Sequence, residues 1–340
     1  MDYSTSERIA VLGAGGWGIA IARLLLDRGF SPVLWEFDPV AARKLQAARE
    51  LPEKLPGISL ASQIEITSEL ADAVDGARAV CVIVPSHTVR SVAEKLSTLN
   101  LELPLVVNFS KGLEVPSLAR LSEVLEHELH GVYPGRVVTV SGPSHAEEVA
   151  RGIPTAVVAA SRSEQAATTV QEMFSNEYFR VYTNSDIVGV ELGGALKNII
   201  AIAAGIIDGL GMGDNTKGAL MTRGIAEMTR LGERLGAKSA TFAGLSGIGD
   251  LITTCTSRHS RNRYVGEQIG RGRTLPQVLE QMSMVAEGVK TTEAAVRLAE
   301  RHGVPMPIAG EVHRVLFEGK PPAAAVADLM KRELKPETWG

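Results

Sequence analysis

The chain contains one long, mostly apolar run that fits best as a buried helix, residues 186–208 (DIVGVELGGALKNIIAIAAGIID), and Lys197 is its only basic residue. At helical spacing, the face that carries Lys197 is lined by small residues, which are Gly193, Gly194, Ala201, Ala204 and Gly205. Large side chains normally cover the packed faces of a buried helix. The small residues therefore leave room for another molecule, or another stretch of backbone, to approach the lysine closely.

The first half of the chain alternates short apolar runs with helix-like segments. Strands are predicted at 8–12, 33–37, 79–84, 105–109, 137–140 and 156–159. Continuous apolar runs such as 79–84 and 105–109 are typical of parallel strands that are buried on both faces. This alternation predicts an α/β fold, a Rossmann-like doubly wound parallel sheet with helices on both sides.

A glycine-rich loop, GAGGWG, follows the first predicted strand and precedes a helix predicted over 19–28. Gly13 would allow the tight turn, Gly15 would let a pyrophosphate meet the backbone, and Gly18 would let the helix pack close to the strand. In this strand–loop–helix context the motif indicates a bound dinucleotide, although a glycine-rich turn without a ligand is the alternative. Together with this loop, Lys197 points to carbonyl chemistry beside a dinucleotide.

From residue 186 onward the pattern predicts helices without strands. The helix-like segments are 186–208, 216–236, 263–271, 275–282, 287–303 and 308–318, separated by glycine-rich turns. We therefore predict two domains, a dinucleotide-binding domain over 1–185 and an all-helical substrate-binding and catalytic domain over 186–340.

The residues after the second predicted strand bear on the choice of dinucleotide. Glu36 and Asp38 follow Gly18 by about 20 residues, where a carboxylate can accept from a ribose 2′-hydroxyl and would repel a 2′-phosphate. Asp38 precedes Pro39, which is the pattern of a helix N-cap. We therefore assign the ribose contact to Glu36, and the sequence favours NAD over NADP.

Loops that follow the later strands would line the ligand crevice of such a sheet. Lys111 follows the 105–109 strand and could reach an oxygen of the substrate or cofactor, although taken alone it fits a solvated loop lysine equally well. Ser144 and His145 follow the 137–140 strand. His145 could be interpreted as a catalytic residue, but a histidine in a turn more often has a structural role and forms hydrogen bonds.

Positive charge is concentrated over residues 257–263, which contain Arg258, Arg261 and Arg263 with two serines and an asparagine. Nearby acidic residues are only Asp250 and Glu267, so much of this charge lacks a partner close in sequence. Forked guanidinium groups with hydroxyl and amide donors suit a phosphate. We expect an anion site here, with an exposed charged loop as the alternative.

Composition excludes several classes of protein. A net charge of −4 argues against a general nucleic-acid surface. The two cysteines fit a cytoplasmic setting without a disulfide framework, and they show no metal-ligand spacing with the seven histidines. The longest apolar stretches carry charged or amide residues, so we expect no membrane span.

Several motifs occur together in a fixed order. They are GAGGWG, VNFSKGLE at 107–114, SGPSHAEEV at 141–149, ELGGALKNIIAIAAGIIDGL at 191–210, GIGDLITTC at 247–255, SRNRYVG at 260–266 and VAEGV at 285–289. In this combination the chain resembles the NAD(P)-dependent glycerol-3-phosphate dehydrogenases of the bacterial soluble type. The resemblance implies a C-terminal all-α domain of the 6-phosphogluconate dehydrogenase type.

The resemblance also implies an activity and its residues. The family interconverts dihydroxyacetone phosphate and sn-glycerol 3-phosphate for glycerophospholipid synthesis, in the cytoplasm and as a homodimer. Implied catalytic residues are Lys197, Lys111 and Asp250. Beside Gly13, Gly15, Gly18 and Glu36, the implied cofactor contacts are Gly16, Trp17, Phe37, Lys111, Ala146, Arg261, Val285 and Glu287. Implied substrate contacts are Lys111, Gly142, Ser144, Lys197, Asn198, Asp250, Thr254, Ser260, Arg261 and Asn262.

Two positions depart from the commonest bacterial pattern, Gly16 where serine is frequent and Glu36 where a small residue is usual. Glu36 agrees with the argument above that a carboxylate at this position would repel the 2′-phosphate of NADP. For Lys197, we expect burial and Lys111 to lower the pKa of the amine and Asp250 to oppose that change.

Two other functions stay open from the sequence. One is a β-hydroxyacid or 6-phosphogluconate type dehydrogenase, which also carries a lysine on a helix. The other is a regulator that senses a dinucleotide without turning it over.

Overall fold

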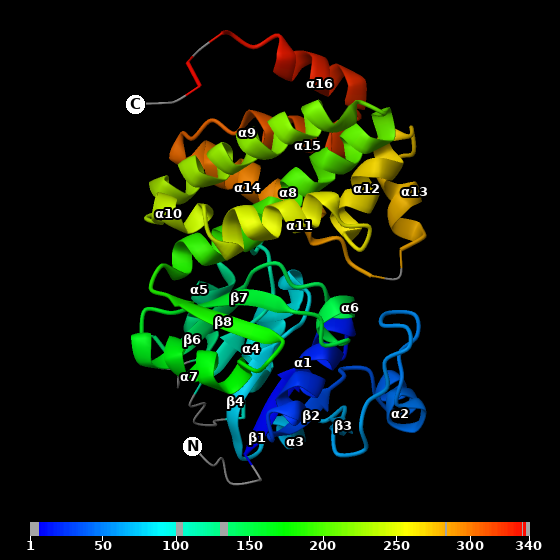
Figure 1. The fold of residues 1–340 in the computed structure, drawn as a ribbon, viewed down its shortest axis with the longest axis vertical. Helices are drawn as coiled ribbons and strands as arrows, with labels where there is room; N and C mark the ends of the chain where they lie inside the picture. The colour runs from blue at the N-terminus through cyan, green and yellow to red at the C-terminus, as the bar shows by residue number, and fades with distance from the viewer. Residues whose placement is uncertain (1–6, 100–104, 130–134, 283, 335, 338–340) are drawn as a thin grey trace.

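The computed structural model describes residues 7–99, 105–129, 135–282, 284–334 and 336–337. Its first half is built on one eight-stranded sheet and its second half on helices (Figure 1). The strands are β1 Arg8–Leu12, β2 Ser31–Trp35, β3 Glu65–Thr67, β4 Ala77–Val82, β5 Val106–Asn108, β6 Val137–Ser141, β7 Thr155–Ala160 and β8 Phe179–Asn184. Their order in the sheet is β3-β2-β1-β4-β5-β6-β7-β8, so the predicted Rossmann-like sheet is confirmed.

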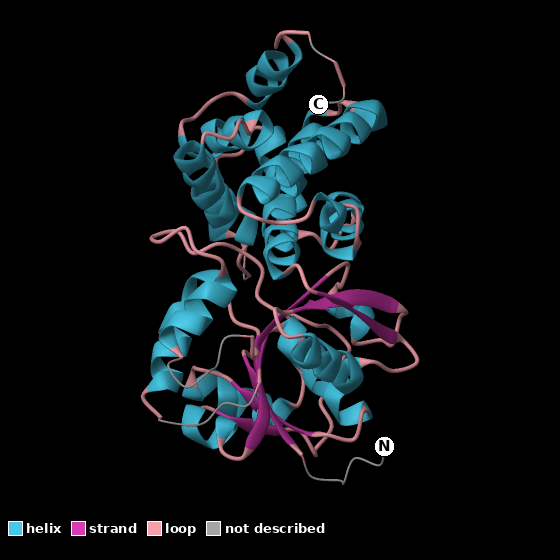
Figure 2. Cartoon of the chain, turned by 90° about the vertical axis from the view of Figure 1, so that its left-hand side faces the viewer, coloured by secondary structure: helices cyan, strands magenta, loops and turns pink. Residues whose placement is uncertain are grey.

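The sheet is buried on both faces, which explains the continuous apolar strands. Ile9 and Val11 of β1 face one core with α1 (Gly16–Asp27), α2 (Pro39–Ala48) and α7 (Glu164–Phe174). Ala10 and Leu12 face a second core with α3 (Leu70–Val74), α4 (Val89–Ser97) and α5 (Leu121–Glu128). Figure 2 shows helices on both sides of the strands.

The prediction of a wholly parallel sheet is wrong at one edge. Strands β1 to β6 pair in parallel, but β7 runs antiparallel to β6, and β8 is parallel to β7. A parallel neighbour needs a long crossover, usually through a full helix. The β6–β7 connection holds only the one-turn helix α6 (Ala146–Val149), so the chain returns in the opposite direction.

Two strands were not predicted from the sequence. The first, β3, is only three residues long. The second, β8, lies at the sheet edge, where buried Phe179 and Val181 alternate with exposed Arg180 and Tyr182. Such alternation differs from the continuous apolar runs used to find the other strands.

In the described residues after β8 there are helices and no strands, as predicted. They are α8 Ile187–Leu210, α9 Gly213–Arg234, α10 Ser239–Phe242, α11 Asp250–Thr256, α12 Arg261–Gly270, α13 Leu275–Glu280, α14 Glu287–His302, α15 Pro307–Phe317 and α16 Pro322–Met330. The helices α10, α11 and α16 were not predicted, and the first two are short. Strands end at Asn184 and α8 begins at Ile187, while the division into domains at residue 185 stays a prediction.

The small residues of α8 accommodate backbone from the same chain. A Cβ atom on Gly205 would overlap the carbonyl oxygen of Arg263 in α12, and one on Gly266 would overlap the carbonyl oxygen of Ile202 in α8. Gly209 and Gly270 face each other in the same way one turn further along. The sequence left open whether another molecule or another stretch of backbone lies against these small residues. Along this part of α8 it is backbone.

By length and composition, α8 could cross a membrane, because an 18-residue window reaches a mean hydropathy of 1.6. All of that window is buried inside the molecule.

Candidate functional site

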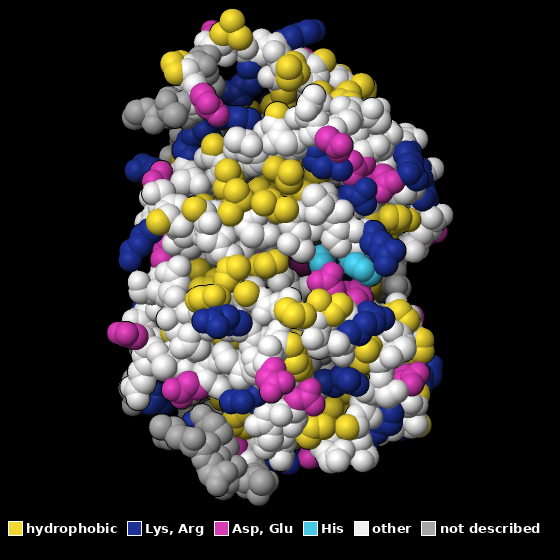
Figure 3. Space-filling view, viewed as in Figure 1, with side chains coloured by type: hydrophobic (Ala, Val, Ile, Leu, Met, Phe, Trp, Pro, Cys, Tyr) yellow, Lys and Arg dark blue, Asp and Glu magenta, His cyan; other side chains and the backbone are white. Residues whose placement is uncertain are grey.

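The carboxyl ends of the parallel strands meet the helical half at one level of the molecule, and the predicted site residues gather there. Loops after β1, β4, β5 and β6 lie at this edge, where a doubly wound sheet places its ligand crevice. Contacts described below join these loops to α8, α11 and α14. Figure 3 shows histidine and acidic side chains at the level where the two halves meet.

The glycine loop has the geometry that a bound pyrophosphate requires. Gly13 has a φ of 117°, and a Cβ there would lie 2.6 Å from the carbonyl oxygen of Ile83. A Cβ on Gly15 would meet no atom within 4 Å, so the loop is open at that point. Gly15 is also the N-cap of α1, where no side chain caps the helix and no acidic residue occupies the first turn. The loop thus fits an anionic ligand.

The end of β2 presents Glu36, Phe37 and Asp38 near the glycine loop. Asp38 Oδ1 accepts a 2.8 Å hydrogen bond from the backbone N of Val40, so its N-cap role is confirmed. Phe37 is 73% exposed, which leaves its ring free to flank a flat ligand. Trp17 is half-buried, with its ring 6.1 Å from that of Phe109 in an edge-on arrangement.

Two lysines share one carboxylate at the centre of the site. Lys197 Nζ of α8 donates to Asp250 Oδ1 at 2.7 Å and to Thr254 Oγ1 at 2.6 Å. Lys111 Nζ, from the loop after β5, donates to Asp250 Oδ2 at 2.7 Å and to the carbonyl oxygen of Gly142 at 2.9 Å. The structure therefore brings together Lys111, Lys197 and Asp250, which lie far apart in sequence.

Close packing on α8 explains how Asp250 reaches Lys197. A π-helical turn, Leu245–Gly249, leads directly into α11, whose first residue is Asp250. A Cβ on Gly193 of α8 would lie 2.6 Å from the carbonyl oxygen of Ser246 in that turn. Gly193 thus lets the turn rest against α8, one helical turn before Lys197.

Burial and charge set the proton affinity of this cluster. Burial lowers the pKa of Lys197 to about 8; Asp250 opposes this change and Lys111 adds to it, as expected from the sequence. Burial alone would raise the pKa of Asp250, but the ammonium groups of Lys111 and Lys197 hold it below its usual value. The result is a buried lysine that can gain and lose a proton near neutral pH.

A second polar group begins at Asn198, the residue that follows Lys197 in α8. Asn262 Nδ2 of α12 donates to Asn198 Oδ1 at 2.8 Å, and Asn262 Oδ1 accepts from the backbone N of Gly288 at 2.9 Å. Ser260 Oγ caps α12 by accepting from the backbone N of Arg263 at 3.2 Å. These contacts fix α12 and the start of α14 against α8.

Arg263, in the charged segment 257–263, has a partner that is distant in sequence. Its guanidinium contacts Asp208 of α8 at 2.7 Å and Glu267 at 3.5 Å. Asp208 was missed because it is distant in sequence. Arg258 and Arg261 are exposed, and Arg261 has no hydrogen bond or ion pair within the described ranges. Of these two exposed arginines, the family resemblance implies only Arg261 as a substrate contact.

Other predicted residues lie at the same edge with different partners. Glu287 at the start of α14 accepts hydrogen bonds from the backbone N and the hydroxyl of Ser86, in the loop after β4. Ser144 Oγ donates to the carbonyl oxygen of Gly142 at 2.9 Å. Ala146 is the nearest side chain to Gly16, and Val285 is half-buried just before α14. The predicted cofactor set is thus drawn from both halves of the chain.

Three polar groups at this edge lie outside the predicted site residues, and they are Ser86, Ser141 and His145. No signal linked Ser86 to Glu287, which is far away in sequence. The hydroxyl of Ser141 and Nε2 of His145 are buried and have no hydrogen-bond partner in the described structure. Burial, and then Lys197, lowers the pKa of His145, whose ring lies 5.8 Å from that of His259.

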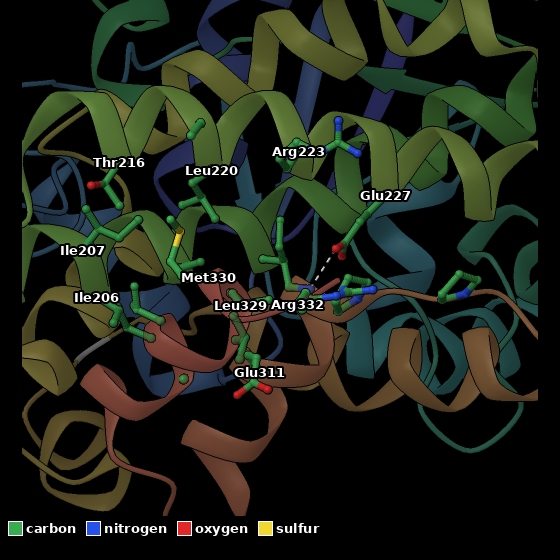
Figure 4. Close-up of a pocket in the computed structure, with 18 of the residues that line it drawn as sticks. Ile206, Ile207, Thr216, Leu220, Arg223, Glu227, Glu311, Leu329, Met330 and Arg332 are labelled. Carbon is green, nitrogen blue, oxygen red and sulfur yellow. Dashed lines mark hydrogen bonds between the residues drawn. The ribbon is translucent and has the colours of Figure 1, made fainter. Parts of the chain in front are cut away.

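A cavity of about 530 Å³ lies elsewhere, among α8, α9, α15 and α16 (Figure 4). It is lined mainly by apolar side chains such as Ile206, Leu220 and Leu329, and it contains none of the predicted site residues. The candidate site is therefore the Lys–Asp–Lys cluster and not this cavity.

Comparison with known proteins decides the family. Family models described as the NAD-dependent glycerol-3-phosphate dehydrogenase N-terminus and C-terminus match residues 8–167 and 186–327. The chain belongs to the NAD-dependent glycerol-3-phosphate dehydrogenase family. The two matched ranges correspond to the sheet half and the helical half.

Individual members of the glycerol-3-phosphate dehydrogenase family are similar over almost the full length. The glycerol-3-phosphate dehydrogenase [NAD(P)+] of Pelotomaculum thermopropionicum is 54% identical over 327 residues, covering 96% of this chain and 94% of that protein. That of Moorella thermoacetica is 54% identical over 326 residues, covering 96% of each. A crystal structure of glycerol-3-phosphate dehydrogenase from Coxiella burnetii superposes with a TM-score of 0.92 at 37% identity, covering 97% of this chain and 100% of that one.

Proposed function

We propose that this chain is an NAD(P)-dependent sn-glycerol-3-phosphate dehydrogenase, which reversibly reduces dihydroxyacetone phosphate to sn-glycerol 3-phosphate. The observation that carries the proposal is the Lys111–Asp250–Lys197 cluster, in which Asp250 and Lys197 are buried, together with a glycine loop that fits a pyrophosphate. Membership of the family agrees with it.

The cofactor would lie across the carboxyl edge of the sheet. The backbone of Gly15, Gly16 and Trp17 at the start of α1 would hold the pyrophosphate, and Phe37 would flank the adenine. When bound, the nicotinamide supplies the hydride for reduction of the ketone and accepts it in the reverse direction. Glu36 would accept from a ribose 2′-hydroxyl and repel a 2′-phosphate, so we propose a preference for NAD.

Lys197 would handle the proton of the reaction. In reduction, its ammonium donates a hydrogen bond to the substrate carbonyl oxygen and delivers the proton as negative charge develops there. In oxidation, the neutral amine takes the hydroxyl proton. A pKa of about 8 makes both forms accessible at neutral pH, whereas an ordinary lysine would remain protonated.

Asp250 and Lys111 would orient Lys197 and tune its charge. Asp250 holds the Lys197 amine and the Lys111 amine through separate carboxylate oxygens, so one carboxylate positions both amines. Lys111 also donates to the carbonyl of Gly142, which anchors the cluster to the loop after β6. Lys111 would contact both substrate and cofactor from this position.

The phosphate arm of the substrate would bind at the start of α12. Arg261 is exposed and without an ion-pair partner among the residues described, so its guanidinium can grip a phosphate. Contacts from three helices would complete the binding, from Asn198 of α8, Thr254 of α11, and Ser260 and Asn262 at the start of α12. Binding the phosphate would order the substrate for proton transfer.

We also propose a setting for this activity. The chain would act as a homodimer in the cytoplasm and provide glycerol 3-phosphate for glycerophospholipid synthesis. These three points rest on the family resemblance.

A steady-state assay with a substrate panel tests the function. Dihydroxyacetone phosphate should oxidise NADH stoichiometrically, with kcat/KM about 100-fold above that for dihydroxyacetone, because charge-assisted bonds to the phosphate are lost in the latter. NADPH should be used less efficiently than NADH. Turnover of 6-phosphogluconate or a β-hydroxyacid in its place, or NADH binding without oxidation, would refute the proposal.

Removing the side chain that is proposed to bind the phosphate should weaken substrate binding more than it lowers turnover. We expect Arg261→Ala to raise the KM for dihydroxyacetone phosphate about 10- to 100-fold, the range for a charged hydrogen bond, with a much smaller change in kcat. Arg258→Ala, in the same segment and also exposed, is the matched control and should leave the KM unchanged. An unchanged KM in the Arg261 variant would reject its phosphate role.

A further inference from the structure

The start of α8 is tied to the sheet half by a buried polar cluster outside the proposed site. Glu191 Oε1 accepts a 2.8 Å hydrogen bond from the backbone N of Ser122, and Glu191 Oε2 accepts from the Ser122 hydroxyl. Arg120 Nη1 donates to Glu191 Oε2 at 2.6 Å. Glu191, Arg120 and Ser122 are 6%, 7% and 2% exposed, so water competes little for these bonds.

This cluster joins the two halves of the chain. Arg120 is the N-cap of α5 and also contacts Glu123 at 2.7 Å, and α5 packs against Val106 and Val137 of the sheet. Glu191 belongs to α8, the helix at the centre of the helical half (Figure 1). We call these residues, Arg120, Ser122 and Glu191, the α5–α8 clamp.

Lys197 lies on the same helix as Glu191 and depends on where that helix sits. Six residues separate the two positions, a rise of about 9 Å, and their side chains point about 120° apart. Glu191 therefore faces the sheet half while Lys197 faces Asp250. Lys111, the other amine held by Asp250, belongs to the sheet half.

We propose that Glu191 is a positioning residue: by holding α8 against α5, it fixes the Lys197 amine relative to Lys111 and Asp250. A second contact lies between them. A Cβ on Gly194 would lie 3.6 Å from Cγ of Lys111 and would also crowd the Ser141 hydroxyl. A tilt of α8 at this point would thus change the separation of the two lysines directly.

The chemistry of the clamp favours positioning over simple stability. A buried ion pair loses much of its attraction to desolvation, and packed apolar side chains of similar volume would stabilise the contact as well or better. Hydrogen bonds from a backbone N–H, a hydroxyl and a guanidinium fix the direction and register of the Glu191 carboxylate. Loss of the clamp would admit water and move Lys111 away, and both changes raise the proton affinity of Lys197.

The test compares Glu191→Gln with the wild-type enzyme, and its kinetic arm rests on the proposed dehydrogenase function. The amide can still accept from the Ser122 N–H but cannot pair with Arg120. We expect kcat to fall at least about 10-fold with KM values nearly unchanged, since small misplacements at a reacting centre are costly. We also expect the alkaline midpoint of the kcat/KM profile for ketone reduction to move upward.

Glu227→Gln is the matched control. Glu227 is also a buried glutamate that joins two elements, because it accepts from the backbone N of Ile308 at 2.8 Å and of Ala309 at 3.3 Å (Figure 4). Both elements belong to the helical half, and Glu227 shares no hydrogen bond with Lys197, Lys111 or Asp250. This variant should lose thermal stability while kcat and the pH midpoint stay at wild-type values.

A milder variant and a second measurement distinguish a positioning role of Glu191 from a purely structural one. Ser122→Ala removes one of the three bonds to Glu191, together with the 2.9 Å bond that the Ser122 hydroxyl accepts from Arg120, but it leaves the Arg120–Glu191 pair. It should shift kcat and the midpoint in the same direction by less. NMR titration of labelled lysine follows Lys197 without any turnover, so it tests the clamp even if the proposed reaction is wrong. A lower melting temperature with unchanged kcat and an unchanged Lys197 midpoint in Glu191→Gln would overturn the proposal.

Discussion

Replacing Lys197 by alanine should lower kcat for dihydroxyacetone phosphate by about 100- to 10,000-fold, the usual contribution of a general acid or base. The amine is buried, is held by Asp250 and Thr254, and has a pKa of about 8. The carbonyl oxygen would then develop its negative charge without a donor.

Cofactor binding should survive in the Lys197→Ala variant. The glycine loop and the start of α1 lie in the sheet half and share no hydrogen bond with Lys197. Quenching of protein fluorescence by NADH would measure the dissociation constant, and stopped-flow absorbance would measure the rate.

A matched control is available on the neighbouring helix. Lys217 of α9 pairs with Asp208 at the far end of α8, so Lys217→Ala removes an amine without touching the site. Its kcat should stay within about threefold of wild type, because the Lys217–Asp208 pair includes no residue of the proposed site. If Lys197→Ala turns over at the same rate as Lys217→Ala, Lys197 is not the proton donor.

Asp250→Asn should affect stability and catalysis together. One carboxylate compensates two amines, so its loss leaves buried positive charge without a partner, at a cost of about 3–5 kcal/mol in the free energy of unfolding. Asp250 raises the pKa of Lys197, so the variant's amine should lose its proton at lower pH than in the wild-type enzyme.

The two directions of the reaction should respond differently to Asp250→Asn. Reduction needs the ammonium form and should slow strongly at pH 7.5, whereas oxidation needs the neutral amine and should slow less. Steady-state rates in both directions, with thermal unfolding followed by circular dichroism, check this. Equal losses in both directions with an unshifted pH midpoint would show that Asp250 acts only on folding.

Much of the fold could be predicted because its strands are buried on both faces. Continuous apolar runs marked β1, β4, β5 and β6, and the glycine loop marked the first crossover. The reversal at β7 depends on the length and content of one connection, which strand patterns do not encode. The edge strand β8 alternates in burial and so lacks the signal of the central strands.

The members of the proposed site stay a prediction, and the contacts among them could not be predicted from the sequence. Lys197 was found because a single basic residue interrupts an apolar helix. The pairing of Asp250 with both lysines, of Arg263 with Asp208 and of Glu191 with Arg120 depends on helix packing that local sequence does not show. Gly193, first interpreted as room beside the lysine, admits the backbone that carries Asp250.

The pH dependence of kcat/KM in both directions tests the central claim most directly, because this ratio reports the proton affinity of the free enzyme. Burial lowers the pKa of Lys197 to about 8, so its ammonium form is lost as pH rises through that value. Reduction of dihydroxyacetone phosphate should therefore fall, and oxidation of glycerol 3-phosphate should rise, through one midpoint near pH 8. Profiles that are flat across this range, or that fall together, would contradict a buried lysine as the carrier of the proton.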